Sequence, residues 1–311
     1  MSHGTHAFHH EALFYDGEEG FLEGTLSFVR DGVWADEPVL VAVSKARGAA
    51  LKDELGGDAE AVHFADMEEL GRNPACIIPA WHEFVQAHGA GGRPLRGIGE
   101  PVWHGRSDAE LTECHRHESL LNLAFENTPA FWLLCPYDKQ ALPDDVLDEA
   151  LRTHPYVANR SESRPNDAYL SPELGPGPFD GELPPPAESP EELTFGRERL
   201  RALRVYVAEW SRRRGLQEQR TDDLVLAVNE LATNSVLHAG GGGTLRLWQE
   251  NGALLAEVCD QGRLYEPLLG RKRPTPDQSS GRGLWLVNNV CDLVQMRTLP
   301  SGTVVRLHMD L

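Results

Sequence analysis

Eight prolines and three glycines lie between Asn159 and Pro190, and this segment constrains the fold more than any other part of the chain. Proline removes a backbone donor and resists the interior of both helices and sheets. The sequence therefore predicts an extended, semi-stiff linker over residues 159–190. This linker would separate an N-terminal domain, residues 1–158, from a C-terminal domain, residues 191–311.

The bulk composition narrows the class of protein. Hydrophobic residues make up 41% and charged residues 25% of the chain, which is ordinary for a soluble globular protein. The net charge of -19 argues against broad nucleic-acid binding, which depends on Lys and Arg neutralising phosphates. Five cysteines without paired spacing suggest free thiols in a reducing compartment. Neither a signal peptide at Met1–His10 nor a membrane span is visible, so we expect a cytoplasmic protein.

Strand and helix signals alternate in the N-terminal domain. Val39–Val43 is a short apolar run of the kind that forms a strand covered on both faces, and a helical stretch follows it. Repeated strand–helix units of this kind predict an α/β fold with a doubly wound, mostly parallel sheet. The expected strand and helix pairs are Val39–Val43 with Ala46–Leu55, Ala61–Phe64 with Ile77–His88, Arg96–Ile98 with Leu111–Phe125, and Ala130–Cys135 with Asp144–Arg152.

Ligands of such folds bind beyond the carboxyl ends of the strands. The loop after Val43 has no GxxxxGK[ST] spacing, so this half lacks a standard nucleotide grip. Polar loop residues could instead line a small-molecule sensor pocket, although polar loops are also expected from solvent exposure alone. The candidate pocket residues are Glu100, Trp103, Tyr137 and Asp138.

Four short motifs of this half resemble the MEDS-type sensory domain of bacterial regulators. They read Leu70-Gly-Arg-Asn-Pro74, Ile78-Pro-Ala-Trp81, Gly97-Ile-Gly-Glu-Pro101 and Cys135-Pro-Tyr-Asp138. The resemblance covers roughly residues 8–157. It implies a RecA-like sheet without the phosphate loop, and a role in sensing a small molecule or in controlling a partner.

The C-terminal domain reads as helices on one face of a mostly antiparallel sheet. A helix is expected over Leu200–Arg214, and a second from a Thr221 cap to about His238, with Leu224, Val228 and Leu231 as its core stripe. Asn251-Gly252 between two apolar runs is a strong hairpin signal. The remaining expected elements are strands at Leu245–Trp248, Leu254–Cys259, Leu293–Thr298 and Thr303–Leu311, and a helix at Gly283–Val290. Together they predict a two-layer α/β sandwich.

Two carboxylates and one amide are the candidate polar groups of this domain. Glu230 and Asn234 are four residues apart on the second helix, so both can face one cleft. The amide oxygen of Asn234 suits Mg²⁺, and Glu230 could deprotonate a hydroxyl. Asp260 ends a strand and could accept a hydrogen bond from adenine, while Gly262 allows close backbone approach. A solvated polar ridge and a simple strand-ending turn are the alternatives.

A glycine-rich loop begins the last helix. Backbone N–H groups at Gly281-Arg282-Gly283-Leu284 would point at phosphate, helped by the helix dipole. Gly270–Ser280 precedes this loop and carries Arg271, Lys272 and Arg273. We expect that segment to be a mobile lid, or else a loop of solvated charge.

The order of these elements resembles the GHKL ATPase family, and its spacing is most similar to the anti-sigma-factor serine kinase branch. The matching boxes are Asn229–Asn234, Asp260–Gly262 and Gly281–Val287, within a match over about residues 191–311. The resemblance implies ATP and Mg²⁺ as cofactors, with Glu230 as general base, Asn234 as magnesium ligand, Asp260 as adenine reader, and Gly281 and Gly283 in the phosphate loop. The chain departs from the family's DxGxG box at Leu264.

The resemblance implies a signalling regulator of transcription: a sensory domain controlling a serine/threonine kinase that phosphorylates an antagonist protein of the STAS type, a sigma factor being another partner. The alternative is an ATP-binding switch that sequesters such a partner without efficient catalysis. A sensor histidine kinase is less favoured, because the proline-rich linker stands where a helical pair with a phospho-acceptor histidine would be expected. We also expect no nucleic-acid or membrane partner, and a homodimer stays open.

Two groups of possible metal ligands complete the sequence. Cys114, His115 and His117 lie too close together on one helix to converge on an ion. The N-terminal His3, His6, His9 and His10 form a fortuitous, flexible cluster in this interpretation.

Overall fold

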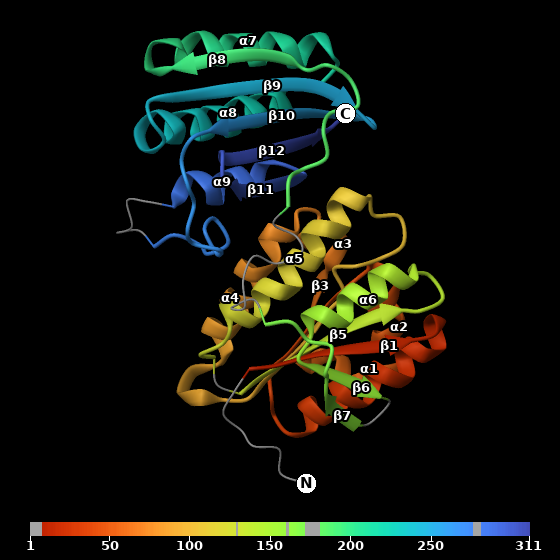
Figure 1. Cartoon of the computed structure of the whole chain (residues 1–311). Coiled ribbons are helices and arrows are strands. Elements are labelled where there is room, and N and C mark those ends of the chain that lie inside the picture. The colour runs from red at the N-terminus through yellow and green to blue at the C-terminus, as the bar shows by residue number, and fades with distance from the viewer. Residues whose placement is uncertain (1–7, 129, 160–161, 172–180, 276–280) are drawn as a thin grey trace. The chain divides into compact units, whose positions relative to one another are not determined.

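The chain folds into two compact units, residues 1–179 and 180–311 (Figure 1). The computed structural model describes residues 8–128, 130–159, 162–171, 181–275 and 281–311. One strand, β7 (Glu162–Pro165), lies inside the segment that the sequence predicts as a linker. Residues 172–180 of that segment lie outside the described residues.

The first unit is built on a seven-stranded sheet with the order β3-β2-β4-β5-β1-β6-β7. All neighbouring strands are parallel except β6 and β7, which form an antiparallel hairpin at one edge. The predicted α/β class with a mostly parallel sheet is confirmed. The strands are β1 (His9–Tyr15), β2 (Val39–Val43), β3 (Val62–Asp66), β4 (Leu95–Gly99), β5 (Phe131–Asp138) and β6 (Tyr156–Asn159), followed by β7.

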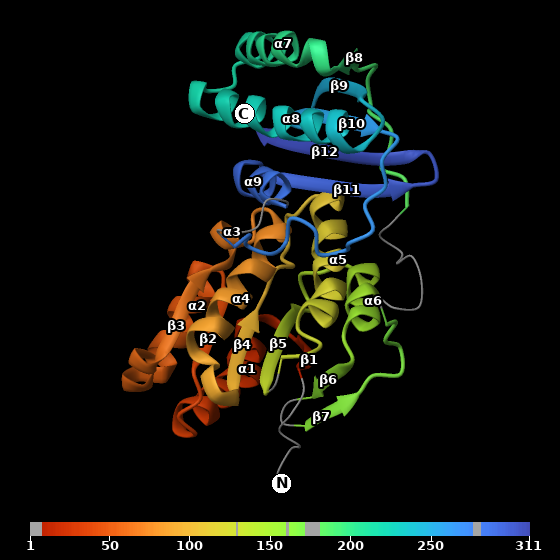
Figure 2. The same ribbon diagram turned by 90° about the vertical axis from the view of Figure 1, so that its left-hand side faces the viewer.

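Helices cover both faces of this sheet (Figures 1 and 2). Apolar side chains of α1 and α2 pack with strand residues such as Val41 and Leu134 in one hydrophobic core. Helices α4, α5 and α6 lie over the opposite face. The helices are α1 (Gly17–Trp34), α2 (Lys45–Leu55), α3 (Met67–Leu70), α4 (Ile77–His88), α5 (Asp108–Ala124) and α6 (Asp144–Thr153). Short 3-10 helices lie at Gly56–Ala61, Pro74–Cys76 and Ala90–Gly92.

The glycines of β4 explain how α4 approaches the sheet. A Cβ built on Gly97 would lie 2.8 Å from the ring of Trp81, and one built on Gly99 would lie 3.0 Å from the same ring. The fully buried Trp81 therefore packs directly on the strand backbone, which only glycine leaves open. Two of the motifs that resemble MEDS domains thus contact each other.

The sequence does not predict the first strand and helix. β1 lies between β5 and β6 inside the sheet, and both His10 and Glu11 are 1% exposed. The interpretation of His9 and His10 as part of a flexible cluster is therefore wrong, because both are strand residues paired with β5. His3 and His6 lie outside the described residues.

The second unit is a five-stranded antiparallel sheet with the order β11-β12-β10-β9-β8. One core combines apolar side chains of this sheet with those of three helices, so the helices cover one face. The predicted two-layer α/β sandwich is confirmed. Its elements are β8 (Glu191–Gly196), a short 3-10 helix (Arg197–Arg199), α7 (Leu200–Arg213), α8 (Glu218–His238), β9 (Gly242–Glu250), β10 (Ala253–Asp260), α9 (Arg282–Val290), β11 (Leu293–Leu299) and β12 (Gly302–Asp310).

The local signals of this unit hold with one correction. Asn251 and Gly252 have φ values of 50° and 80°, as the tight β9–β10 hairpin requires. Leu224, Val228 and Leu231 are buried in the core. Thr221 is not the cap of α8, since the helix begins at Glu218 and the buried Thr221 hydroxyl donates to the carbonyl of Leu216.

Two further expectations concern the whole chain. All five cysteines carry free thiols, as their spacing predicts. Among the described residues, no helix combines the length and the apolar character that crossing a membrane requires.

We expect Gly302→Ala to destabilise the second unit more than Gly252→Ala. Both glycines have positive φ, but a Cβ on Gly302 would lie 1.9 Å from the carbonyl oxygen of Asp260, whereas one on Gly252 meets nothing within 4 Å. Backbone strain alone costs about 1–2 kcal/mol, and the clash should raise the loss at Gly302 to about 2–4 kcal/mol. Hydrogen exchange of the β10 and β12 amides measures the difference, and equal exchange in the two variants would contradict it.

Candidate functional site

Glu230 and Asn234 lie on the side of α8 that faces the start of α9. Both side chains are partly buried, while the apolar side chains of α8 (Leu224, Val228 and Leu231) pack in the core. A Cβ built on Gly283 would lie 2.8 Å from Oε2 of Glu230 and 3.5 Å from Nδ2 of Asn234. Gly283 therefore lies directly against Glu230 and Asn234, and a side chain at position 283 would clash with the Glu230 carboxylate.

Asp260 is tied to the same end of α8. Its Oδ2 accepts a hydrogen bond of 2.6 Å from the hydroxyl of Ser235, the residue that follows Asn234. Its Oδ1 accepts a 2.8 Å bond from the backbone N–H of Gly262. The carboxylate at the end of β10 is thereby held in place, and each oxygen keeps a further lone pair for a ligand.

Gly262 is confined as closely as Gly283. A Cβ at position 262 would lie 2.7 Å from the Cβ of Ala239, beyond the end of α8. The carbonyl of Gly262 accepts a 2.8 Å hydrogen bond from the hydroxyl of Thr303 on β12. Ser235 and Thr303 are functional candidates that the sequence interpretation missed, because single Ser and Thr residues carry no pattern that distinguishes such contacts.

The glycine-rich loop has the backbone geometry of a helix start. Gly281 has a φ of 87° and is the N-cap of the nine-residue α9, whose first N–H groups lack intrahelical partners by construction. The side chain of Leu284 is buried in the core, so only its backbone can face a ligand. Arg282 is exposed and donates to the carbonyl of Thr275 at 3.4 Å.

The segment before this loop is anchored at its beginning. The side chain of Asn288 donates to the carbonyl of Gly270 at 2.9 Å, and Arg271 is buried while Lys272 and Arg273 are exposed. Arg271 is therefore not a solvated lid residue. The rest of the expected lid, residues 276–280, lies outside the described residues.

Leu264, which departs from the family pattern, is directed toward the core. It is partly buried against the hydrophobic cluster under the sheet, and its carbonyl accepts a 3.2 Å hydrogen bond from Thr298. The loop after Asp260 is therefore held by packing and by a backbone contact at this position.

In the first unit, the candidate pocket residues separate into two groups. Glu100 and Asp138 meet at the carboxyl ends of β4 and β5, where the guanidinium of Arg47 contacts both carboxylates. The hydroxyl of Tyr15, at the end of β1, donates to Glu100 at 2.8 Å. Strands β2 and β4 are neighbours, but the chain continues from β2 to β3 on one side and from β4 to β5 on the other. Sheets of this kind bind ligands at such a change of direction, beyond the carboxyl ends of the two strands.

The other two pocket candidates lie elsewhere. Trp103 is stacked on Arg106, whose guanidinium carbon is 3.6 Å from the ring centroid. Tyr137 is fully buried, and its ring centroid is 5.5 Å from that of His154. The structure thus brings together Glu100 and Asp138, with Arg47 and Tyr15 as partners that the sequence interpretation did not single out.

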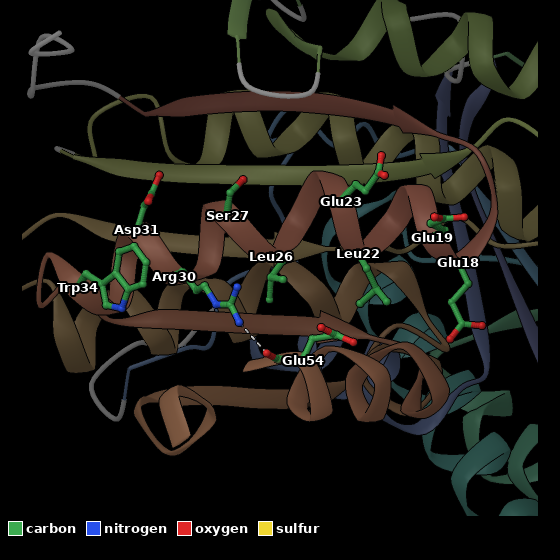
Figure 3. A pocket seen from close by; sticks show the side chains of 10 residues that line it. All are labelled: Glu18, Glu19, Leu22, Glu23, Leu26, Ser27, Arg30, Asp31, Trp34 and Glu54. Carbon is green, nitrogen blue, oxygen red and sulfur yellow. Dashed lines mark hydrogen bonds between the residues drawn. The ribbon is translucent and has the colours of Figure 1, made fainter. Parts of the chain in front are cut away.

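A groove of about 770 Å³ runs along the outer side of α1 (Figure 3). Leu22, Leu26 and Trp34 supply apolar surface between acidic side chains, and Arg30 donates to the carbonyl of Glu54 on α2. The groove contains none of the candidate site residues of either unit. It is a surface feature of the first unit.

Two family models match the chain. The first, "MEDS: MEthanogen/methylotroph, DcmR Sensory domain", matches residues 9–155, and the second, "Histidine kinase-like ATPase domain", matches residues 194–309. A search of curated proteins found no match. The first matched region covers β1 to β5 of the first sheet, and the second covers the second sheet from within β8 to within β12. Both agree with the resemblances seen in the sequence motifs.

We expect Arg47→Met to destabilise the first unit by about 3 kcal/mol at neutral pH, because it leaves the buried Glu100 carboxylate without its cation. Burial already raises the pKa of Glu100, and Arg47 opposes that shift. Removing Arg47 therefore raises this pKa further. The stability deficit should be small below about pH 4, where the carboxyl is protonated in both states, and should grow as pH rises.

Thermal unfolding at several pH values measures this deficit. The double variant Arg47→Met/Glu100→Gln should recover much of the loss, because the uncompensated charge is gone. A deficit that does not depend on pH would show that Arg47 acts by packing alone.

Proposed function

We propose that the chain, a MEDS sensory domain followed by a histidine kinase-like ATPase domain, is a signalling regulator whose ATPase domain acts as a protein serine/threonine kinase. Its substrate would be an antagonist protein of the anti-sigma type. The observation that carries the proposal is the close approach of Glu230 and Asn234 to Gly283, with Asp260 held at the same end of α8 by Ser235.

The residues at this contact fit ATP and Mg²⁺. The absence of a side chain at Gly283 leaves the backbone at the start of α9 open beside Glu230, and the N-terminus of a helix favours anions. The free lone pairs of Asp260 suit the exocyclic amine of adenine, and the amide oxygen of Asn234 suits a magnesium ion. Bound ATP would supply the transferred phosphoryl group, with Mg²⁺ neutralising the phosphate oxygens.

The chain's own part in the reaction is positioning and proton transfer. Glu230 would accept the proton of the attacking serine hydroxyl, since its carboxylate lies beside the phosphate loop at Gly283. Ser235 would keep Asp260 oriented toward the adenine ring, and Thr303 would fix the backbone at Gly262. Such transfer needs few catalytic groups, because stabilisation of charge and alignment carry most of it.

The connection between the domains favours a serine/threonine kinase over a sensor histidine kinase. Residues 166–171 and 181–190, the described parts of the connection between β7 and β8, contain no helix. A phospho-acceptor histidine on a helical pair would need one there. Acid-labile phosphate on the chain itself would overturn this choice.

An ATP-binding switch without efficient transfer is the second candidate function. Leu264 favours it, because this side chain is used for core packing in the loop that follows the adenine-reading position. Binding of ATP in calorimetry, together with the absence of phosphoserine on any STAS-type partner, would support the switch over the kinase.

We expect Gly283→Ala to weaken ATP binding, whereas Gly196→Ala should leave it unchanged. The new methyl group at 283 would lie 2.8 Å from a Glu230 oxygen and displace that side chain, while a Cβ at 196 meets only the carbonyl of Gly241 at 3.5 Å. The loss should exceed tenfold in the dissociation constant, equivalent to about 1.4 kcal/mol. Isothermal titration with ATP and Mg²⁺ measures it, and equal affinities in the two variants would refute this location of the phosphate loop.

Glu230→Gln should separate binding from transfer. Losing the general base should lower phosphate transfer by about 10²–10⁴-fold while ATP still binds. Asn234→Ala should abolish magnesium-dependent transfer. Asn229→Ala is the matched control, because that amide accepts a hydrogen bond from Arg204 on α7.

The measurement is acid-stable phosphoserine on a purified STAS-type antagonist mixed with the full chain and ATP. Normal transfer by the Asn234→Ala or Glu230→Gln variant would remove the proposed roles.

A further inference from the structure

A second polar centre lies within the MEDS domain, apart from the Arg47 network. Four side chains from four separate segments meet between the sheet and α5, and each is at most 1% exposed. Histidine, carboxylate and thiol groups are rarely all removed from water at one point without a partner that accounts for them. The members of this buried cluster are His10 on β1, Glu118 on α5, Cys135 on β5 and His154 just after α6.

The donor atoms of the buried cluster all lie within 4.8 Å of one another, close enough to bind one ion. Nε2 of His10 lies 3.0 Å, and Nε2 of His154 3.4 Å, from Oε2 of Glu118. Sγ of Cys135 lies 3.4 Å from Nε2 of His10 and 3.6 Å from Oε2 of Glu118. Zinc–ligand bonds of about 2.0–2.3 Å in a tetrahedron put neighbouring ligand atoms roughly 3.3–3.8 Å apart.

The hydrogen bonds behind the two histidines fix which ring nitrogens face the cluster. Nδ1 of His154 is 2.7 Å from the carbonyl of Ala150, which can only accept, so this nitrogen carries the proton. Nδ1 of His10 is 3.1 Å from Oδ1 of Asn122, whose amide nitrogen donates to the carbonyl of Thr153 at 2.8 Å. Both Nδ1–H groups are therefore donated away, and both Nε2 lone pairs are directed to the cluster. Metal-binding histidines are oriented in this way.

This arrangement leaves acceptors facing one another. With the Nδ1 protons placed as above, the two Nε2 atoms and the Glu118 carboxylate have lone pairs and no proton of their own to share. The Cys135 thiol and the Tyr137 hydroxyl, which lies against Glu118, can each supply one proton. Within the described part of the chain, Nε2 of His154 and Oε1 of Glu118 make no hydrogen bond. Leaving buried polar atoms unsatisfied destabilises the fold. A cation at the centre of the cluster removes this cost.

We propose that the buried cluster binds one divalent transition-metal ion, and that the ion is zinc. Two imidazole nitrogens, one carboxylate oxygen and one thiolate sulfur make a closed four-ligand set, which is typical of structural zinc sites. Thiolate and imidazole ligands disfavour magnesium and calcium, which prefer oxygen. Because the ligands come from β1, α5, β5 and the segment after α6, the ion joins the helical layer to the sheet.

The first test is the metal content of the purified full chain. We expect stoichiometric zinc by elemental mass spectrometry, and its loss in Cys135→Ser. Cys114→Ser is the matched control, because this equally buried cysteine of α5 donates to the carbonyl of Pro101 and lies outside the cluster. A variant lacking residues 1–7 should keep its zinc, which distinguishes the buried cluster from His3 and His6.

Cobalt gives a second readout that reports the ligands directly. After removal of the native ion and addition of Co²⁺, the full chain should show a thiolate-to-cobalt charge-transfer band, and Cys135→Ser should lack it. Asn122→Ala keeps all four ligands but frees the His10 ring, so we expect it to weaken metal affinity about 10–100-fold in competition with a chromophoric chelator.

Three results would overturn the proposal: a wild-type chain that neither contains zinc nor shows the cobalt band, zinc content unchanged by Cys135→Ser, or loss of zinc on removal of residues 1–7. Stoichiometric iron instead of zinc, lost in Cys135→Ser, would keep the site and overturn the identity of the ion.

Discussion

A carboxylate that is removed from water needs a hydrogen-bond donor or a cation, and this requirement shapes both domains. Glu100 obtains the Arg47 guanidinium and the Tyr15 hydroxyl. Asp260, which is partly buried, obtains the Ser235 hydroxyl and a backbone N–H. Glu118 is surrounded by two histidines and a thiol. In each case the carboxylate joins segments far apart in sequence, and the partner fixes how a helix meets the strand ends beside it.

The sequence predicts most elements, because their patterns are local. The apolar run of β2, the Asn251-Gly252 turn and the stripe of α8 each follow from neighbouring residues, and the structure contains all three. The fold class of both domains follows from the order of such elements.

β1 escapes this reasoning for a physical reason. Its sequence begins His-His-Glu, which reads as solvated, yet the strand lies inside the sheet with His10 and Glu11 buried. The indole of Trp132 donates to Glu11, and Asn122 and Glu118 contact His10. These partners come from α5 and β5, more than a hundred residues away, so no local sequence pattern predicts them. The prediction for Thr221 is wrong for the opposite reason. Threonine is a common N-cap residue, but Thr221 lies within α8.

In the candidate nucleotide site, some residues can be found from local motifs and others only from the folded structure. Motif spacing is enough to single out Glu230, Asn234 and the two glycine positions, because each lies in a short, ordered segment. Ser235 and Thr303 are recognisable only once α8, β10 and β12 are folded together, since what distinguishes them is the atom that each hydroxyl contacts. Glu100 and Asp138 could be placed at strand ends from the sequence, whereas Arg47 as their shared cation could not.

The Arg47 guanidinium binds both carboxylates at the strand ends where sheets of this kind receive small molecules, so a ligand of this position would meet a cation already in place. An incoming compound has to displace this side chain or bind around it. A ligand with a cationic group could replace Arg47 as the partner of the two carboxylates. A neutral hydrocarbon that displaced Arg47 would leave these carboxylates without a cation. A ligand at this position would therefore be selected by how well its cationic group competes with Arg47 for the two carboxylates.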